Sequence, residues 1–152
     1  MLQSCRATDS RFMRQVIPYK LWLGHAGDAR NLRGLLAVGI AALVDLAGEE
    51  PPAPLVRDLV YCRFPLVDGA GNAPWLLRAA IDTTAGLLRE RVPALVACGA
   101  GMSRSPAVVA AALARFEDRS LAECLADLTR FGPCDVAVGL WQDVLESLHL
   151  RR

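Results

Sequence analysis

A cysteine and an arginine on one glycine-containing loop are the residues of this chain best suited to chemistry. Residues 95–112 read LVACGAGMSRSPAVVAAA: a short apolar run leads to Cys98, a loop carries Gly99 and Gly101, and an alanine-rich helix follows Arg104. A cysteine that faces a helix N-terminus meets unpaired amides and the positive end of the helix dipole, which stabilise a thiolate or a bound phosphate. The guanidinium adds two parallel donors for phosphate oxygens. The sequence therefore predicts a phosphate cradle with a thiol at its floor.

The spacing of cysteine, five residues and arginine is not specific by itself. It occurs twice more, at Cys5/Arg11 and at Cys124/Arg130, where no glycine lies between the two ends. Cys124 also lies inside a helical pattern, in which the backbone amides are already hydrogen-bonded. Only the loop after Cys98 combines a preceding strand, two glycines and a serine-proline pair that begins a helix.

This loop resembles the active-site loop of the cysteine-dependent protein tyrosine phosphatases, in particular the small dual-specificity group. The residues that match the pattern are Cys98, Gly101, Arg104 and Ser105. Residues 17–46 are similar to the family's opening strand, helix and strand, and residues 64–69, FPLVDG, are similar to its acid-bearing loop. The chain departs from the family at Ala97, where the family has a histidine that helps to organise the loop.

The residue types and the resemblance together assign a role to each part of the loop. Cys98 is the expected nucleophile, because the thiolate is the reactive form and a helix N-terminus favours it. Arg104 is expected to hold two phosphate oxygens. Ser105 is expected to donate a hydrogen bond to the sulfur, although a serine there also fits a plain helix cap. The backbone amides that complete the phosphate site are those of Gly99, Ala100, Gly101, Met102, Ser103 and Arg104.

Asp68 is the expected general acid. It follows a predicted strand and precedes a glycine in a loop rich in glycine and proline. An Asp-Gly pair is also a common turn, so other carboxylates stay open as substitutes. These are Asp45 at the end of a strand, and Glu49 and Glu50 in the loop that follows it. Asn72 is either a plain turn residue or the residue that orients the acid loop.

These assignments predict an enzyme of the dual-specificity type, a metal-independent phosphomonoester hydrolase that works through a covalent phosphocysteine. The resemblance implies a phosphorylated protein or peptide as substrate, with phosphotyrosine and also phosphoserine and phosphothreonine accepted. No metal and no cofactor are expected. Two alternatives remain: a phosphoprotein-binding module that keeps the cradle without turnover, and a rhodanese-like sulfurtransferase, which also sets a cysteine loop against a helix.

Composition and length predict one globular domain and argue against several partners. The chain has 152 residues, 53% hydrophobic residues and a formal net charge of +1, so nothing favours nucleic-acid or anionic-membrane binding. Its longest apolar stretch is far shorter than the roughly 20 residues that span a bilayer. The five cysteines form no metal-ligand pattern, which favours a reducing compartment, and we expect a cytoplasmic protein. Residues 1–14 are polar and irregular and are expected to be a loose leader.

Apolar periodicity predicts an α/β fold with a mainly parallel central sheet flanked by helices on both faces. Strands are expected over residues 16–23, 40–46, 58–64 and 93–97, and helices over residues 29–38, 75–91, 105–116 and 138–148, with one more opened by the capping box of Ser120 and Glu123. The tryptophans Trp22, Trp75 and Trp141 fall on apolar faces and are expected in the core. Ligands of such sheets bind at the carboxyl ends of the strands, where Cys98 is expected.

Overall fold

Five strands form one sheet in the order β1-β2-β5-β3-β4, in the computed structural model of residues 13–54 and 56–149. The strands are β1 (Arg14–Gln15), β2 (Leu21–His25), β3 (Ala42–Ala47), β4 (Val60–Leu66) and β5 (Ala94–Cys98). All neighbouring pairs are parallel except β1 and β2. Because β5 lies between β2 and β3, Cys98 leaves the sheet near its centre.

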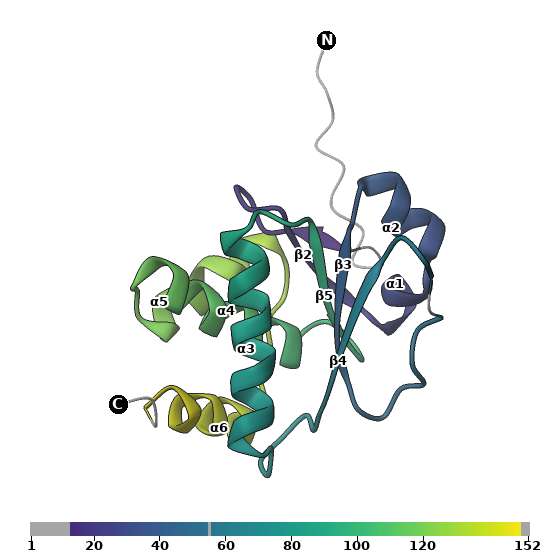
Figure 1. Cartoon of the computed structure of the whole chain (residues 1–152). Coiled ribbons are helices and arrows are strands. Elements are labelled where there is room, and N and C mark those ends of the chain that lie inside the picture. The colour runs from purple at the N-terminus through teal and green to yellow at the C-terminus, as the bar shows by residue number, and fades with distance from the viewer. Residues whose placement is uncertain (1–12, 55, 150–152) are drawn as a thin grey trace.

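Helices cover both faces of this sheet, as Figure 1 shows. One side carries α1 (Ala26–Arg30) and α2 (Leu32–Val38), and the other carries α3 (Pro74–Arg89), α4 (Arg104–Glu117), α5 (Leu121–Leu128) and α6 (Val138–His149), with the short 3-10 helix η1 (Thr129–Phe131) after α5. The prediction of a mainly parallel sheet flanked by helices on both faces is confirmed. No helix in the described part of the chain is long and apolar enough to cross a bilayer.

The alternation of side chains along the central strands divides the core in two. On β5, Val96 and Cys98 face the larger cluster under α3 and α4, whereas Leu95 and Ala97 face a smaller cluster with Leu35 of α2. All five residues of β5 are buried, as expected for a central parallel strand that is apolar on both faces. Cys98 therefore enters the loop from a rigid, fully packed strand.

Helix α4 is the most deeply buried helix of this core. Its first ten residues are all buried, and the run of alanine and valine lets the helix lie close to the sheet. The helix begins at Arg104, directly after the loop. The packing of these ten residues thus holds the N-terminus of α4 against the end of β5.

Three sequence-based expectations were wrong in detail. The helix expected over residues 29–38 is two short helices, because the side chain of Asn31 accepts the amide of Gly34 at 3.1 Å and starts α2. Arg14, assigned to a loose leader, lies in β1 and pairs with Leu23 of β2. Trp75, expected in the core, is 65% exposed at the start of α3. Residues 1–12, with the pair Cys5/Arg11, lie outside the described residues.

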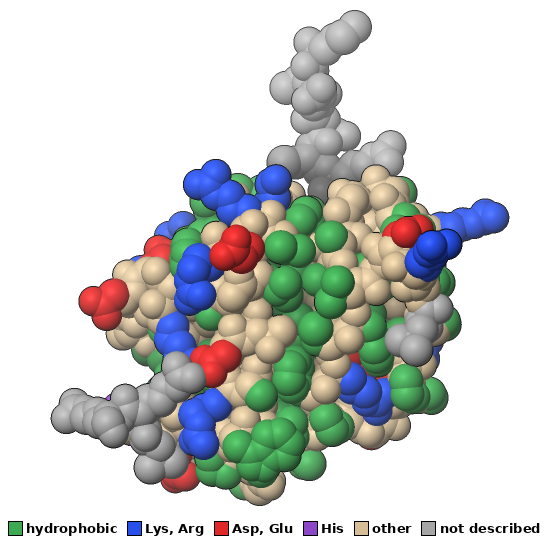
Figure 2. All heavy atoms as spheres, in the orientation of Figure 1, with side chains coloured by type: hydrophobic (Ala, Val, Ile, Leu, Met, Phe, Trp, Pro, Cys, Tyr) green, Lys and Arg blue, Asp and Glu red, His purple; other side chains and the backbone are tan. Residues whose placement is uncertain are grey.

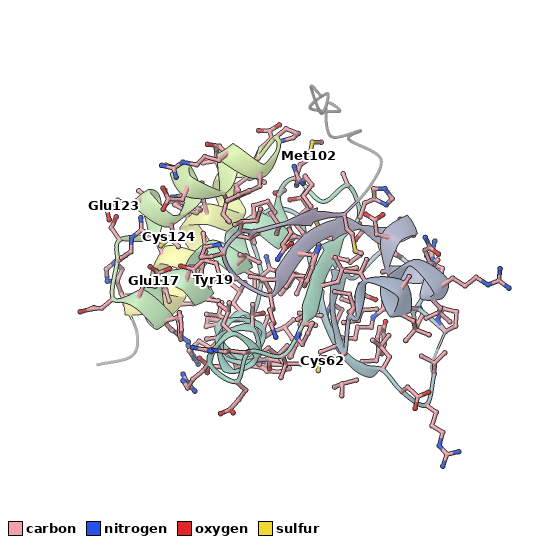
Figure 3. The ribbon with its side chains drawn as sticks, turned by 90° about the horizontal axis from the view of Figure 1, so that it is seen from above. Tyr19, Cys62, Met102, Glu117, Glu123 and Cys124 are labelled. Atoms are coloured by element: carbon pink, nitrogen blue, oxygen red, sulfur yellow. The ribbon has the colours of Figure 1, made fainter. Side chains whose placement is uncertain are left out.

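Hydrophobic side chains also gather on the outer surface along α3 and the edge strand β4, as Figure 2 shows. Val60 of β4 and Trp75 of α3 are exposed by 59% and 65%. The four described cysteines are free thiols. Cys124 lies within α5, as its helical pattern predicts, and Cys62 lies on β4, in a different part of the molecule (Figure 3).

Candidate active site

Cys98 lies at the end of β5 with its sulfur directed at the start of α4. The residue is 1% exposed, and the backbone N–H of Ser105 donates to the sulfur over 3.4 Å. Ser105 is in the first turn of α4 and is not its cap, a position that Ser103 takes. The Ser105 hydroxyl oxygen is buried and has no hydrogen-bond partner among the described residues. The amide of Ser105 therefore contacts the nucleophile, and the hydroxyl of the same residue is left without a partner among the described residues.

The loop between Cys98 and Arg104 is shaped by close contact with the end of β2. Gly101 has φ +75°, and a Cβ atom there would lie 2.9 Å from the backbone of Gly24. The amide of Ala26 donates to the carbonyl of Gly99 at 3.2 Å, and that of Asp135 to the carbonyl of Met102 at 2.7 Å. The positive φ and the close approach of Gly24 require a glycine at residue 101, for both conformation and space.

Arg14 supplies a further tie to the same loop. Its guanidinium donates to the carbonyl of Gly101 at 2.9 Å and to that of Pro133 at 3.3 Å. Ala97, where the family has histidine, lies in the apolar cluster with Leu43 and makes no polar contact to the loop through its side chain. Arg14 of β1 thus ties the carbonyls of Gly101 and Pro133 to the edge of the sheet. No sequence pattern indicated this contact.

Arg104 is buried, 3% exposed, and one edge of its guanidinium is occupied by Glu49. The Nη1 and Nη2 atoms each donate to one carboxylate oxygen of Glu49 at 2.5 Å, and Nη1 also donates to the carbonyl of Leu66 at 3.0 Å. The hydrogen bonds from Arg104 lower the pKa of Glu49 below its ordinary value. The Nε atom is buried and has no hydrogen-bond partner among the described residues. The edge of the guanidinium that contains Nε is thus available to an anion.

Asp68 and the phosphate loop are in direct contact. The Ser103 hydroxyl donates to Oδ1 of Asp68 at 2.5 Å. The pKa of Arg104 is raised, first by its hydrogen bond to Glu49 and also by the nearby charges of Cys98 and Asp68. The structure therefore brings Cys98, Arg104 and Asp68 to one end of the sheet.

Asn72 holds the acid loop in shape. Its side chain accepts the amide of Val67 at 2.8 Å and donates to the carbonyls of Val67 and Gly69 at 3.0 and 2.9 Å. Its own amide donates to Asp143 of α6 at 3.0 Å. Asn72 is therefore more than a plain turn residue, and it fastens the loop that carries Asp68 to α6.

The substitute carboxylates have other partners. Asp45 is buried, accepts the hydroxyl of Tyr61 at 2.5 Å and the amide of Ala47 at 3.1 Å, and so holds β3 and β4 together. Glu50 pairs with Arg30 at 3.0 Å on the surface. Among the described residues, no group of three His, Cys, Asp or Glu side chains could hold a metal ion.

Solved structures share this fold over nearly the whole chain, although no family model and no curated protein sequence matches it. Human DUSP28 is 25% identical, with a TM-score of 0.78 over 90% of this chain and 96% of that one. A mouse putative dual specificity phosphatase complexed with zinc tungstate is 24% identical, with a TM-score of 0.80 over 99% of this chain and 94% of that one. The human tyrosine phosphatase-like serine/threonine/tyrosine-interacting protein is 21% identical, with a TM-score of 0.78 over 92% and 97%.

The chain thus has the fold of the cysteine-dependent phosphatases, and among them it resembles the dual-specificity group. The expected family resemblance is confirmed at the level of the fold. The match extends over residues on both sides of the cysteine loop.

Proposed function

We propose that this chain is a phosphatase that hydrolyses phosphomonoesters through a covalent phosphocysteine on Cys98, without a metal ion. The described residues would act as one catalytic domain. The proposal depends mainly on one observation: at the start of α4, where the Ser105 amide contacts the Cys98 sulfur, the buried Nε of Arg104 and the buried hydroxyl of Ser105 have no partner among the described residues. Buried donors are normally satisfied, and a phosphate group could accept from such donors.

In the first step the Cys98 thiolate attacks phosphorus, a sulfur–phosphorus bond forms, and the ester oxygen leaves. Asp68 gives its proton to that oxygen. In the second step water attacks phosphorus and passes a proton to the Asp68 carboxylate, while the sulfur leaves as a thiolate and inorganic phosphate is released. Ser105 would stabilise the departing thiolate by donating a hydrogen bond to it, and Arg104 would hold the phosphoryl oxygens throughout.

The proposed substrates are phosphorylated proteins or peptides. The similar structures include proteins named as dual-specificity phosphatases, which favours phosphotyrosine together with phosphoserine and phosphothreonine. The five loop residues from Gly99 to Ser103 contain no lysine or arginine. A substrate with several phosphate groups would need further cations beside the loop, so a single phosphate is the better fit.

A phosphoprotein-binding module without turnover is the second candidate. Ala97 supports it, because an apolar residue stands where a polar side chain would organise the loop. The likeness to a tyrosine phosphatase-like interacting protein points the same way. In that case the free edge of Arg104 would bind a phosphate group that is never transferred to Cys98.

Phosphate release from para-nitrophenyl phosphate in EDTA, between about pH 5 and 8, separates the two candidates. We expect turnover by the wild type, none by Cys98→Ser, and unchanged turnover by Cys62→Ser, a matched control at another free thiol. A folded wild type that binds a phosphotyrosyl peptide but releases no phosphate would contradict the enzyme and support the binding module.

A further inference from the structure

Ser103 has an unusual place at the start of α4. It occupies the N-cap position, where a serine ordinarily accepts an amide of the first turn, yet its side chain makes no such capping bond. The residue is 8% exposed, and its hydroxyl is directed to two other segments. The Ser103 side chain is therefore held by these contacts and not by a capping hydrogen bond.

The two contacts determine the direction of the hydroxyl hydrogen. The amide of Ala137 donates to Ser103 Oγ at 3.0 Å, and Ser103 Oγ lies 2.5 Å from Oδ1 of Asp68. A backbone N–H can only donate, so the serine oxygen must accept from Ala137 and its single hydrogen goes to the carboxylate. The other oxygen of Asp68 has no hydrogen bond to a described residue.

Ser103 therefore connects three segments that meet beside the cradle. Ala137 precedes α6, and α6 also accepts the amide of Asn72 in the acid loop through Asp143. The acid loop packs closely on the same helix, since a Cβ atom at Gly139 would lie 2.7 Å from the amide of Ala70. Neither Asp68 nor Ser103 can shift alone without breaking one of these contacts.

We infer that Ser103 is a positioning residue, which holds the carboxyl group of Asp68 within reach of the leaving oxygen when a phosphoester lies in the cradle. This inference rests on the proposed function. Ser103 acts through the carboxylate and does not transfer a proton itself. It differs in this from Ser105, whose amide contacts the sulfur and whose hydroxyl would serve the second step.

Ser103→Ala is expected to affect the acid step selectively. A general acid contributes roughly 10²–10⁴-fold, and it matters most when the leaving oxygen is strongly basic. We expect kcat to fall by at least about tenfold with phenyl phosphate and by less than about threefold with para-nitrophenyl phosphate, whose leaving group needs little protonation. The affinity for orthovanadate, which probes the cradle itself, should not change.

A double-mutant cycle with Asp68→Asn tests whether the serine works through the acid. We expect Ser103→Ala to have almost no further effect on kcat in the Asp68→Asn background, because there is no acid left to position. Ser147→Ala is the matched control: this serine is fully buried and donates to the carbonyl of Val144 in α6, away from the loop. Ser147→Ala should leave kcat unchanged for both substrates.

The outcomes separate this inference from the proposed function. A wild type without turnover would overturn both. Two results with an active wild type would overturn the inference alone. In the first, Ser103→Ala lowers kcat by the same factor for phenyl phosphate and para-nitrophenyl phosphate. In the second, Ser103→Ala lowers kcat by its full factor again in the Asp68→Asn background. Loss of orthovanadate binding in Ser103→Ala would also overturn it, because the serine would then serve the shape of the cradle.

Discussion

Replacing Asn72 by alanine tests whether the acid loop is held by one side chain. Asn72 is 9% exposed, and its amide group makes three hydrogen bonds to the backbone of Val67 and Gly69 at 2.8 to 3.0 Å. Each such bond contributes about 0.5–1.5 kcal/mol. Because the loop is partly open to water, we expect the free energy of unfolding to fall by about 2–3 kcal/mol.

The same change should lower activity by displacing Asp68. The bonds fix the loop on both sides of this residue, so we expect kcat with phenyl phosphate to fall by at least about tenfold, with orthovanadate binding retained. Unfolding in urea and steady-state kinetics measure the two effects. Asn31→Ala is a matched control, because Asn31 caps α2 with one exposed bond to Gly34. Asn31→Ala should lower the free energy of unfolding by about 1 kcal/mol and leave kcat unchanged.

The reasoning would be refuted by a variant at residue 72 that is no less stable than the Asn31→Ala control. It would also be refuted if stability fell as expected but kcat for phenyl phosphate did not. In the first case the loop would be held by its packing on α6. In the second case the position of Asp68 would not depend on the shape of its loop.

Three further predictions concern the loop, its arginine and a tyrosine far from it. Gly101→Ala should reduce activity at least about tenfold. Gly39 has a similar positive φ but open space around it, so Gly39→Ala should lower the free energy of unfolding in urea by only about 1 kcal/mol and leave the activity unchanged. Equal activities of these two variants would contradict the close packing of the loop. Arg104 lowers the pKa of Glu49 from its ordinary 4.5, so the stability gap between wild type and Glu49→Gln should be present above pH 4.5 and close as the pH falls further. The gap should be at most about 1 kcal/mol because the carboxylate is half exposed, and a gap that persists in acid would contradict the ion pair. Burial and a hydrogen bond to a glutamate raise the pKa of Tyr19 to about 12, so its contribution to stability is complete below pH 10 and is lost toward pH 12. Urea unfolding of wild type and Tyr19→Phe over this pH range measures the contribution. A difference in their free energies of unfolding that changes below pH 10 would contradict the prediction.

Tyr19 belongs to a region distinct from the candidate active site. It contacts Glu117 and Phe116 of α4, and in Figure 3 it lies with Glu117 and Cys124, apart from Met102 of the phosphate loop. Its titration therefore reports on the packing of the fold and not on catalysis.

The central strands and the cysteine loop could be predicted because their signals are local. A continuous apolar run can satisfy both faces of a buried strand, and this pattern identified β3 and β5. Cys98 and Arg104 are close in the chain, so one turn brings them together whatever the rest of the fold does. Their proximity follows from the loop sequence alone.

The supports of the site could not be predicted, because they depend on the order of the strands. Glu49 reaches Arg104 because β3 lies beside β5, and Arg14 reaches Gly101 because β1 and β2 lie on the other side. Neither neighbour relation has a local pattern. Trp75 was misplaced for a related reason, since helical periodicity does not reveal that a residue in the first turn of α3 is left exposed.

The most direct test of the central claim is to look for the covalent intermediate. The wild type is mixed with para-nitrophenyl phosphate, quenched in acid within the first turnover, digested and analysed by mass spectrometry. We predict that the peptide containing Cys98 gains the mass of one phosphoryl group, and that no such species forms in Cys98→Ser. Turnover without this species, or a phosphoryl group on another residue, would contradict the account.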